Sequence, residues 1–348
     1  MTTRILILGA TGYIGGSILT ELIAQNTDGK KYTLSALVRK PEQASILQKL
    51  GVNASVFRDL ADIESIRKAA GENDLIIAAA DARHAESAKA CITGLADRSR
   101  STGQKTSYIH TAGTSMVADW PVLGERIDTS IHSDVDEDIF QSEKDNPEPW
   151  SDVRKVNQVV VKLGEDFGVN IYIVAPPMIF GFGTGLFTTG FGQIHMLAEL
   201  SLEHKQAIIL GNGSGIWSVI HIKDLSKMYY LLVQAVIERN SALPNGKKGY
   251  YFAENGSHSW KSIAEEIGKF GNENGVFKTD KVITIHMYEV ADKYFNRDIR
   301  HAESVLGSNS RTKADLARKV LGWEPKYGDD VFFQQVRDDI ATMIKSRS

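Results

Sequence analysis

The sequence predicts an α/β fold: a doubly wound parallel sheet with a second, smaller lobe built mostly from the C-terminal part. Two observations predict it. A glycine-rich turn at residues 9–16 joins a short apolar run to a helical pattern, and strand-like and helix-like segments alternate through the first half of the chain. Such alternation is typical of parallel sheets with helices on both faces.

The glycine turn is the most specific feature of the chain. Residues 5–8 are four consecutive aliphatic residues, which predicts a buried strand, and apolar residues recur at helical spacing after residue 17. Gly9 permits the tight turn, Gly12 lets a pyrophosphate approach the backbone, and Gly15 lets helix and strand pack closely. We therefore predict a dinucleotide site at the helix N-terminus. Its contacts in this turn are Gly9, Thr11, Gly12, Tyr13, Ile14 and Gly15.

The remaining elements follow in order. Strands are predicted at 32–38, 54–57, 75–80, 107–111 and 171–174, and helices at 41–50, 63–70 and 88–95. A glycine-rich stretch at 182–192 departs from this pattern, and the sheet resumes with a helix at 225–237 and a strand at 249–252. We therefore expect a nucleotide-binding domain at 1–180, joined by 221–255, and a substrate-binding lobe at 181–220 and 256–348.

Between Glu125 and Glu148 the alternation lapses. This window holds nine acidic residues against Arg126 and Lys144, a local charge of −7. The favoured interpretation is a solvated surface insertion. The alternative is a lid over the active site, because the window connects two elements that are expected to face the cofactor.

Composition excludes several classes of function. The hydrophobic fraction of 42% and charged fraction of 24% are ordinary for a globular protein, and a net charge of −3 does not suggest nucleic-acid binding. No apolar run reaches the roughly 20 residues of a membrane span, and no signal peptide is recognised. A single cysteine, Cys91, excludes an internal disulfide and suits the cytoplasm, where we expect this protein. No metal site is predicted.

The end of the second strand selects the cofactor. An acid there would bond the ribose hydroxyl of NAD, whereas Arg39 and Lys40 suit the 2′-phosphate of NADP. NADP(H) is therefore favoured over NAD(H). Asp59 and Leu60 follow the third strand, where such folds hold the adenine. The small residues after the fourth strand, Ala79 and Ala80, let the backbone pass close to the cofactor.

Together these residues resemble the extended or atypical branch of the short-chain dehydrogenase/reductase superfamily, whose members have a Rossmann sheet and are epimerase-like or reductase-like. The resemblance covers nearly the whole chain. Its motifs are the glycine turn, Ala175–Gly181, Gly211-Asn212-Gly213 with Val219–Leu225, and Leu321–Pro325. It implies NAD(P) binding, with Thr111, Pro176, Pro177, Met178 and Ile179 near the nicotinamide. It also implies a homodimer, by analogy alone.

The catalytic pattern of that superfamily is incomplete here. Its members use Ser or Thr with Tyr-x-x-x-Lys, in which the lysine lowers the pKa of the tyrosine, the general acid. At the corresponding place there is no tyrosine. One register puts Ser151 and Lys155 at the tyrosine and lysine positions, and the other puts Trp150 and Arg154 there. Either register keeps a cation near the nicotinamide ribose.

The hydroxyl partner is Thr114 or Ser115, after the fifth strand. His110 is interpreted as a packed core residue, His132 as one replacement acid among several in the acidic window, and His221 as structural support for the helix that follows. Trp217, Phe182 and Phe187 suggest an apolar substrate pocket.

The leading functional hypothesis is an NADP-dependent oxidoreductase acting on a small, apolar carbonyl, alcohol or conjugated alkene. The second is a non-redox NADP-sensing regulatory protein of the NmrA type. A third is an isomerase or epimerase that retains its cofactor.

Overall fold

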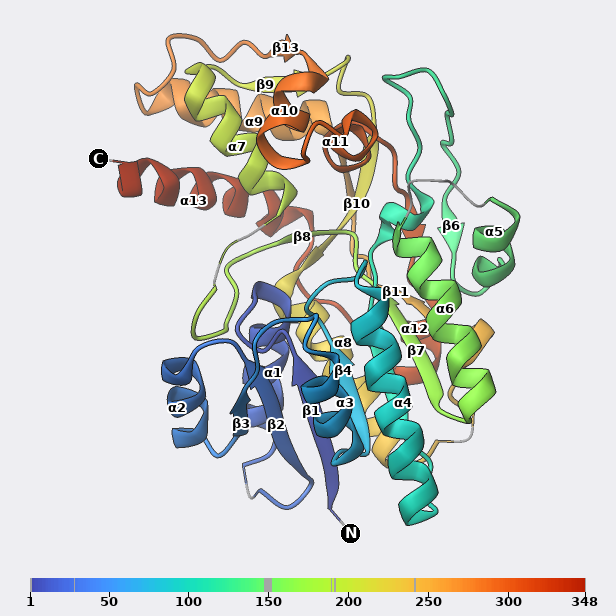
Figure 1. The fold of residues 1–348 in the computed structure, drawn as a ribbon. Coiled ribbons are helices and arrows are strands. Elements are labelled where there is room, and N and C mark those ends of the chain that lie inside the picture. Colours follow the sequence, from blue (N-terminus) through green and yellow to red (C-terminus); the bar gives the residue numbers. More distant parts are fainter. Residues whose placement is uncertain are drawn as a thin grey trace.

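The computed structural model describes residues 2–27, 29–146, 152–188, 190, 192–240 and 242–347. Its main sheet has seven parallel strands in the order β11-β7-β5-β4-β1-β2-β3 (Figure 1). The strands are β1 (Thr3–Leu8), β2 (Tyr32–Val38), β3 (Asn53–Val56), β4 (Leu75–Ala78), β5 (Ser107–Thr111), β7 (Asn170–Ala175) and β11 (Tyr250–Phe252).

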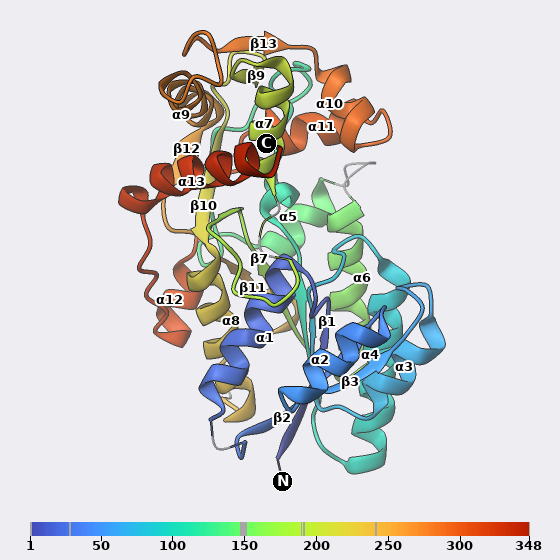
Figure 2. The same ribbon diagram turned by 90° about the vertical axis from the view of Figure 1, so that its left-hand side faces the viewer.

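Helices cover both faces of this sheet, as the alternating pattern predicts. In Figure 2, α1 and α8 lie on one face and α3, α4 and α6 on the other. The helices are α1 (Tyr13–Gln25), α2 (Pro41–Lys49), α3 (Ile63–Gly71), α4 (Ala85–Thr102), α6 (Asp152–Phe167) and α8 (Ile222–Ile237). The predicted α/β doubly wound fold is therefore confirmed.

A second lobe lies beyond the carboxyl ends of the strands (Figure 1). It contains a three-stranded sheet, β12-β10-β8, and the pair β13-β9, with helices around them. The strands are β8 (Met178–Phe180), β9 (Ile208–Leu210), β10 (Ile216–His221), β12 (Ser257–Ser259) and β13 (Ile283–Ile285). The helices are α7 (Gln193–His204), α9 (Trp260–Glu273), α10 (Met287–Tyr294), α11 (Ile299–Leu306) and α13 (Asp329–Arg347).

Each lobe has its own hydrophobic core. The segment α12 (Asp315–Leu321) and Trp323, inside the expected 256–348 lobe, pack in the core of the main sheet. The Trp323 indole donates to the Asp224 carbonyl at 3.0 Å, and the Asp224 carboxylate accepts two backbone N–H groups from the same segment. His221 caps α8 by accepting from the Lys223 N–H, which confirms its structural role. The domain boundaries themselves stay a prediction.

The acidic window forms a clasp, residues 119–146, which runs beside both lobes between η1 (Thr114–Val117) and α6 (Figure 1). It contains β6 (His132–Ser133), paired with β14 (Thr312–Lys313), and α5 (Ile139–Asp145). Asp134 is buried and accepts backbone N–H groups from Phe252, Asp315 and Leu316, each at 2.9 Å.

The interpretation of this window as a solvated insertion is therefore wrong for its buried acids. Glu143 is also buried, and accepts from Asn157, Gln158 and the Tyr250 hydroxyl at 2.7–3.1 Å. Glu125 reaches the second lobe through two bonds from Arg300, each 2.9 Å. The physical reason is that donors for these carboxylates come from distant segments, which a local charge count does not reveal.

The clasp predicts a pH dependence of stability. Burial raises the pKa of Glu143 from 4.5 to about 7, so between these values the folded protein binds a proton that the unfolded chain does not. Protonation of Glu143 therefore adds up to about 3 kcal/mol to the free energy of unfolding. This contribution is complete below pH 4.5 and is lost as pH rises through 7.

Thermal unfolding of the wild type and E143Q, followed by circular dichroism from pH 5 to 8, checks this. The wild type should lose stability relative to E143Q as pH rises. E42Q, at an exposed position on α2, is the control and should follow the wild type. Parallel curves for all three proteins would contradict the assignment.

Candidate functional site

The glycine turn has the backbone geometry that a nucleotide cradle requires. Gly9 has φ +84°, and the Gly12 N–H donates to the Gly9 carbonyl at 2.9 Å, which closes the turn. A Cβ on Gly9 would lie 2.5 Å from the Ala79 carbonyl oxygen, and one on Gly15 would lie 2.3 Å from the Gly9 oxygen. Side chains at these two positions are therefore excluded by backbone atoms.

Helix α1 begins immediately after this turn. Gly12 is its N-cap and makes no side-chain capping bond, so the first-turn N–H groups, including those of Tyr13 and Ile14, have no intrahelical acceptor. They lie at the carboxyl edge of β1 with the positive end of the helix dipole. A diphosphate fits this arrangement. The Tyr13 side chain turns away, because its hydroxyl donates to the Gly181 carbonyl at 2.5 Å.

The cations after β2 stand at the same edge. Arg39 and Lys40 are both exposed there. The next strand ends alongside, since the Phe57 N–H donates to the Val38 carbonyl at 3.0 Å. This brings Arg58 and Asp59 into the neighbourhood, paired with each other at 3.5 Å. Sequence reasoning missed Arg58, although its place at the end of the third strand was a signal.

Four other predicted cofactor residues lie at the carboxyl edge of the sheet, and some of them could contact a cofactor only through their backbone atoms. Ala79 and Ala80 follow β4, against Gly9. Thr111 ends β5, but its hydroxyl lies 2.6 Å from the Tyr229 hydroxyl in the core, so it presents no free side chain to a ligand. Leu60 follows Asp59 and is half-buried.

The segment 176–179 links the two lobes at this edge. Pro176 and Pro177 are buried, and the Pro176 carbonyl accepts from the Thr114 N–H at 3.0 Å. Met178 begins β8 with its side chain in the core of the second lobe. Ile179 is half-buried and faces a pocket of about 230 Å³ with Tyr13.

Comparisons with known proteins agree with this geometry. Residues 1–95, which contain the glycine turn, match the NmrA-like family. The chain is similar to UDP-glucuronic acid 4-epimerase from Bacillus cereus, with a TM-score of 0.63 and 16% identity, covering 98% of this chain and 99% of that one. It is also similar to DesIV, a dTDP-glucose 4,6-dehydratase from Streptomyces venezuelae, with a TM-score of 0.67 and 11% identity over 99% and 98%.

The chain therefore has the fold of these sugar-nucleotide epimerases and dehydratases, and its first 95 residues are similar to the NmrA-like family. Among curated proteins, this chain is 27% identical to oxidase ucsJ of Acremonium sp, covering 93% of each chain. It is 23% identical to the uncharacterized protein YLL056C of Saccharomyces cerevisiae, over 93% and 95%. The glycine cradle has the geometry that the diphosphate of a dinucleotide requires.

The two candidate hydroxyl residues differ in their surroundings. Thr114 is fully buried, and its Oγ1 accepts from the Ser310 hydroxyl at 2.9 Å. Ser115, the next residue of η1, is half-buried, and no hydrogen bond of its hydroxyl is found within the described residues. Of the two, Ser115 is the more exposed residue.

The two candidate cations on α6 also differ in burial and in hydrogen-bond partners. Arg154 is 5% exposed; its Nε donates to the Met116 carbonyl at 2.5 Å and its Nη1 to the Asn146 carbonyl at 2.8 Å. Lys155 lies on the exposed face and pairs with Asp152 at 3.2 Å. Arg154 therefore holds η1, which carries Ser115. Trp150 and Ser151, the two candidates for the tyrosine position, lie outside the described residues.

One contact between the two lobes involves groups that sequence reasoning missed. Arg83, in the β4–α4 loop, lies 2.6 Å from Nε2 of His301 on α11 of the second lobe. Burial and the neighbouring Arg83 charge lower the pKa of His301 to about 4, so it is neutral at pH 7. The signal was weak: Arg83 lies five residues after the end of the fourth strand, and its partner is 218 residues away.

The other histidines have structural surroundings. His110 is 2% exposed, and burial lowers its pKa to about 4, which confirms its place in the core. His132, a candidate acid, contacts Glu137 at 2.9 Å and Asp128 at 3.6 Å within the clasp. Across the described residues, no group of three His, Cys, Asp or Glu side chains is arranged to hold a metal ion. None of the helices described there is long and apolar enough to cross a membrane.

The three aromatic residues suggested for an apolar pocket do not meet. Trp217 is buried in the second core against Trp260, with ring centroids 6.0 Å apart. Phe187 faces a separate pocket of about 210 Å³ beside α1 and α2, while Phe182 is 40% exposed and borders the pocket at Tyr13. This corrects the sequence interpretation, because composition reveals aromatic residues but not which core they join.

Proposed function

We propose that this protein is an NADP-dependent oxidoreductase acting on a small carbonyl compound or alcohol. The observation that carries the proposal is the cradle. The N–H groups of Tyr13 and Ile14 in the first turn of α1 have no intrahelical acceptor, and Arg39 and Lys40 lie exposed at the end of the adjacent strand. A diphosphate and a 2′-phosphate would occupy these two positions. The name of the relative ucsJ, an oxidase, supports redox chemistry.

When bound, the nicotinamide would supply or accept a hydride. The residues of this chain have two roles in the proposal. Ser115 donates a hydrogen bond to the substrate oxygen, and Arg154 positions Ser115 through the Met116 carbonyl while adding positive charge near that oxygen. Because no tyrosine stands at the general-acid position, the proton comes from Ser115 or from water held there.

Cofactor choice is tested by R39D. Removing the guanidinium and adding a carboxylate should lower the ratio of NADP to NAD affinity on the order of 100-fold, because charge-assisted bonds are worth about 1.5–3 kcal/mol. The ratio is measured by fluorescence titration of each coenzyme. K49D, at an exposed position at the far end of α2, is the control and should leave the ratio unchanged. An unchanged ratio in R39D would sink the NADP assignment.

The hydroxyl assignment is tested by S115A and T114A. S115A should lower kcat on the order of 100-fold with little change in melting temperature, since one preorganised donor is lost. T114A should chiefly lower the melting temperature, because it leaves the buried Ser310 hydroxyl with one acceptor fewer. Full activity in S115A would remove Ser115 from the mechanism.

A second candidate is an NADP-sensing protein without turnover. Two observations favour it: the NmrA-like match over residues 1–95, and the lack of a tyrosine at positions 150 and 151. Prolonged incubation with NADPH and a panel of carbonyl compounds distinguishes the two. Loss of absorbance at 340 nm supports the oxidoreductase, whereas tight binding without consumption supports the sensor.

A further inference from the structure

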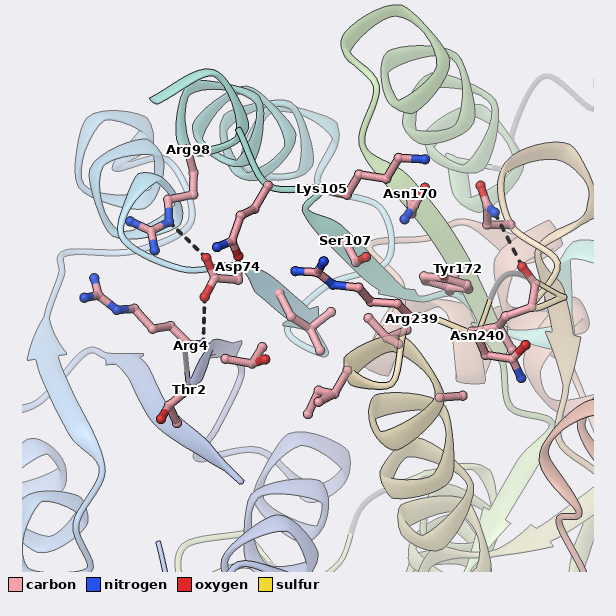
Figure 3. A pocket seen from close by; sticks show the side chains of 18 of the residues that line it. Thr2, Arg4, Asp74, Arg98, Lys105, Ser107, Asn170, Tyr172, Arg239 and Asn240 are labelled. Atoms are coloured by element: carbon pink, nitrogen blue, oxygen red, sulfur yellow. Dashed lines mark hydrogen bonds and ion pairs between the residues drawn. The ribbon is translucent and has the colours of Figure 1, made fainter. Parts of the chain in front are cut away.

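A large pocket lies at the amino ends of the strands, at the opposite edge of the sheet from the glycine cradle. Its volume is about 1300 Å³. The starts of β1, β4, β5 and β7 and the last turn of α8 surround it (Figure 3). We call it the amino-edge pocket. Neither the cofactor nor the proposed substrate site uses it.

The amino-edge pocket is positively charged, although the chain carries a net charge of −3. Among its described lining residues are five cations and a single acid, Asp74. That acid is already satisfied, because its Oδ1 accepts from Arg98 at 3.0 Å and its Oδ2 from the Arg4 N–H at 2.9 Å. The cations are Arg4, Lys31, Arg98, Lys105 and Arg239. A concave surface with one sign of charge concentrates anions.

Arg239 is the central cation of the pocket. Figure 3 shows its side chain reaching across the pocket toward Ser107 and Asp74. Its backbone has φ +54°, a conformation that favours glycine or asparagine at the end of a helix. Neither Arg239 nor Lys105 has a side-chain ion pair among the described residues. The Arg239 side chain therefore presents an uncompensated guanidinium to the pocket.

The remaining lining residues indicate the shape of the ligand. Leu75, Tyr172 and Leu243 supply apolar surface, and Ser107 and Asn170 supply hydrogen-bonding groups. Guanidinium forks match phosphate oxygens, and several cations together suit more than one negative charge. We propose that the amino-edge pocket binds a phosphorylated small molecule, with its phosphates at Arg239 and Lys105 and its organic part on the apolar surface.

The test uses inorganic pyrophosphate as the probe, titrated calorimetrically into the full chain saturated with NADP. The proposal expects saturable, salt-sensitive binding that weakens at least tenfold in R239N/K105Q. Asparagine tolerates the left-handed backbone, so this variant should fold as the wild type does, which circular dichroism checks. The control R297N/K261Q removes the same charges from exposed positions of the second lobe and should bind like the wild type.

Three results would overturn the proposal. They are no binding at low millimolar pyrophosphate, equal binding by R239N/K105Q, and binding that R39D abolishes while R239N/K105Q retains it, which would place the probe in the cofactor cradle. Equal affinity for citrate would overturn the assignment to phosphate. A negative result in the pyrophosphate titration does not affect the proposed oxidoreductase function. That function is tested separately, by the coenzyme affinities of R39D and by NADPH consumption.

Discussion

G15A is expected to weaken NADP(H) binding on the order of 100-fold. The added Cβ would lie 2.3 Å from the Gly9 oxygen and 2.7 Å from the Gly9 carbonyl carbon, and both are backbone atoms that cannot rotate away. Helix α1 must therefore move from β1, and the N–H groups of Tyr13 and Ile14 move with it. Overpacking should also cost about 1–3 kcal/mol of stability.

Fluorescence titration with NADPH and thermal unfolding measure the two effects of G15A. G71A is the matched control: it is the same change within a helix, and its Cβ would meet the Gly94 oxygen at an ordinary 3.7 Å. It should leave the affinity for NADPH unchanged. Wild-type affinity in G15A would mean that the cradle does not depend on this close packing.

R154M is expected to lower kcat by 100-fold or more and to destabilise the fold by roughly 2–4 kcal/mol. The methionine cannot donate, so the Met116 and Asn146 carbonyls lose their bonds, and burying an unsatisfied acceptor costs about 1–3 kcal/mol. Because Met116 follows Ser115 in η1, the hydroxyl loses its position together with the nearby charge.

K155M is the control for R154M, since it is the same kind of change one residue further along α6. Lys155 is exposed and its pair with Asp152 is a surface ion pair, so kcat should stay within about twofold of the wild type. R154K keeps the charge and should recover part of kcat even where R154M folds poorly. Loss of activity in K155M with retention in R154M would favour the register that pairs Lys155 with Ser151.

Much of the nucleotide-binding half could be predicted from local patterns. Strands at 32–38 and 107–111 have the bounds that were expected, and those of β1, β3 and β7 differ from the expected ones by one or two residues. The predicted helix at 88–95 is longer, at 85–102, because polar residues at its C-terminal end hide the helical period. The glycine turn could be predicted because two of its constraints are local: Gly9 adopts φ +84°, and Gly15 packs against the backbone of Gly9, six residues before it.

The sequence by itself determined the alternating sheet, the glycine cradle and the pair of cations after the second strand. Only the tertiary structure decided that Arg154 is buried and Lys155 exposed, that Thr114 bonds Ser310, and that the clasp buries Asp134 and Glu143. The physical reason is the separation along the sequence of the residues that interact. Periodicity and backbone freedom are set by near neighbours, whereas burial and hydrogen-bond partners are supplied by segments that meet only when the chain folds.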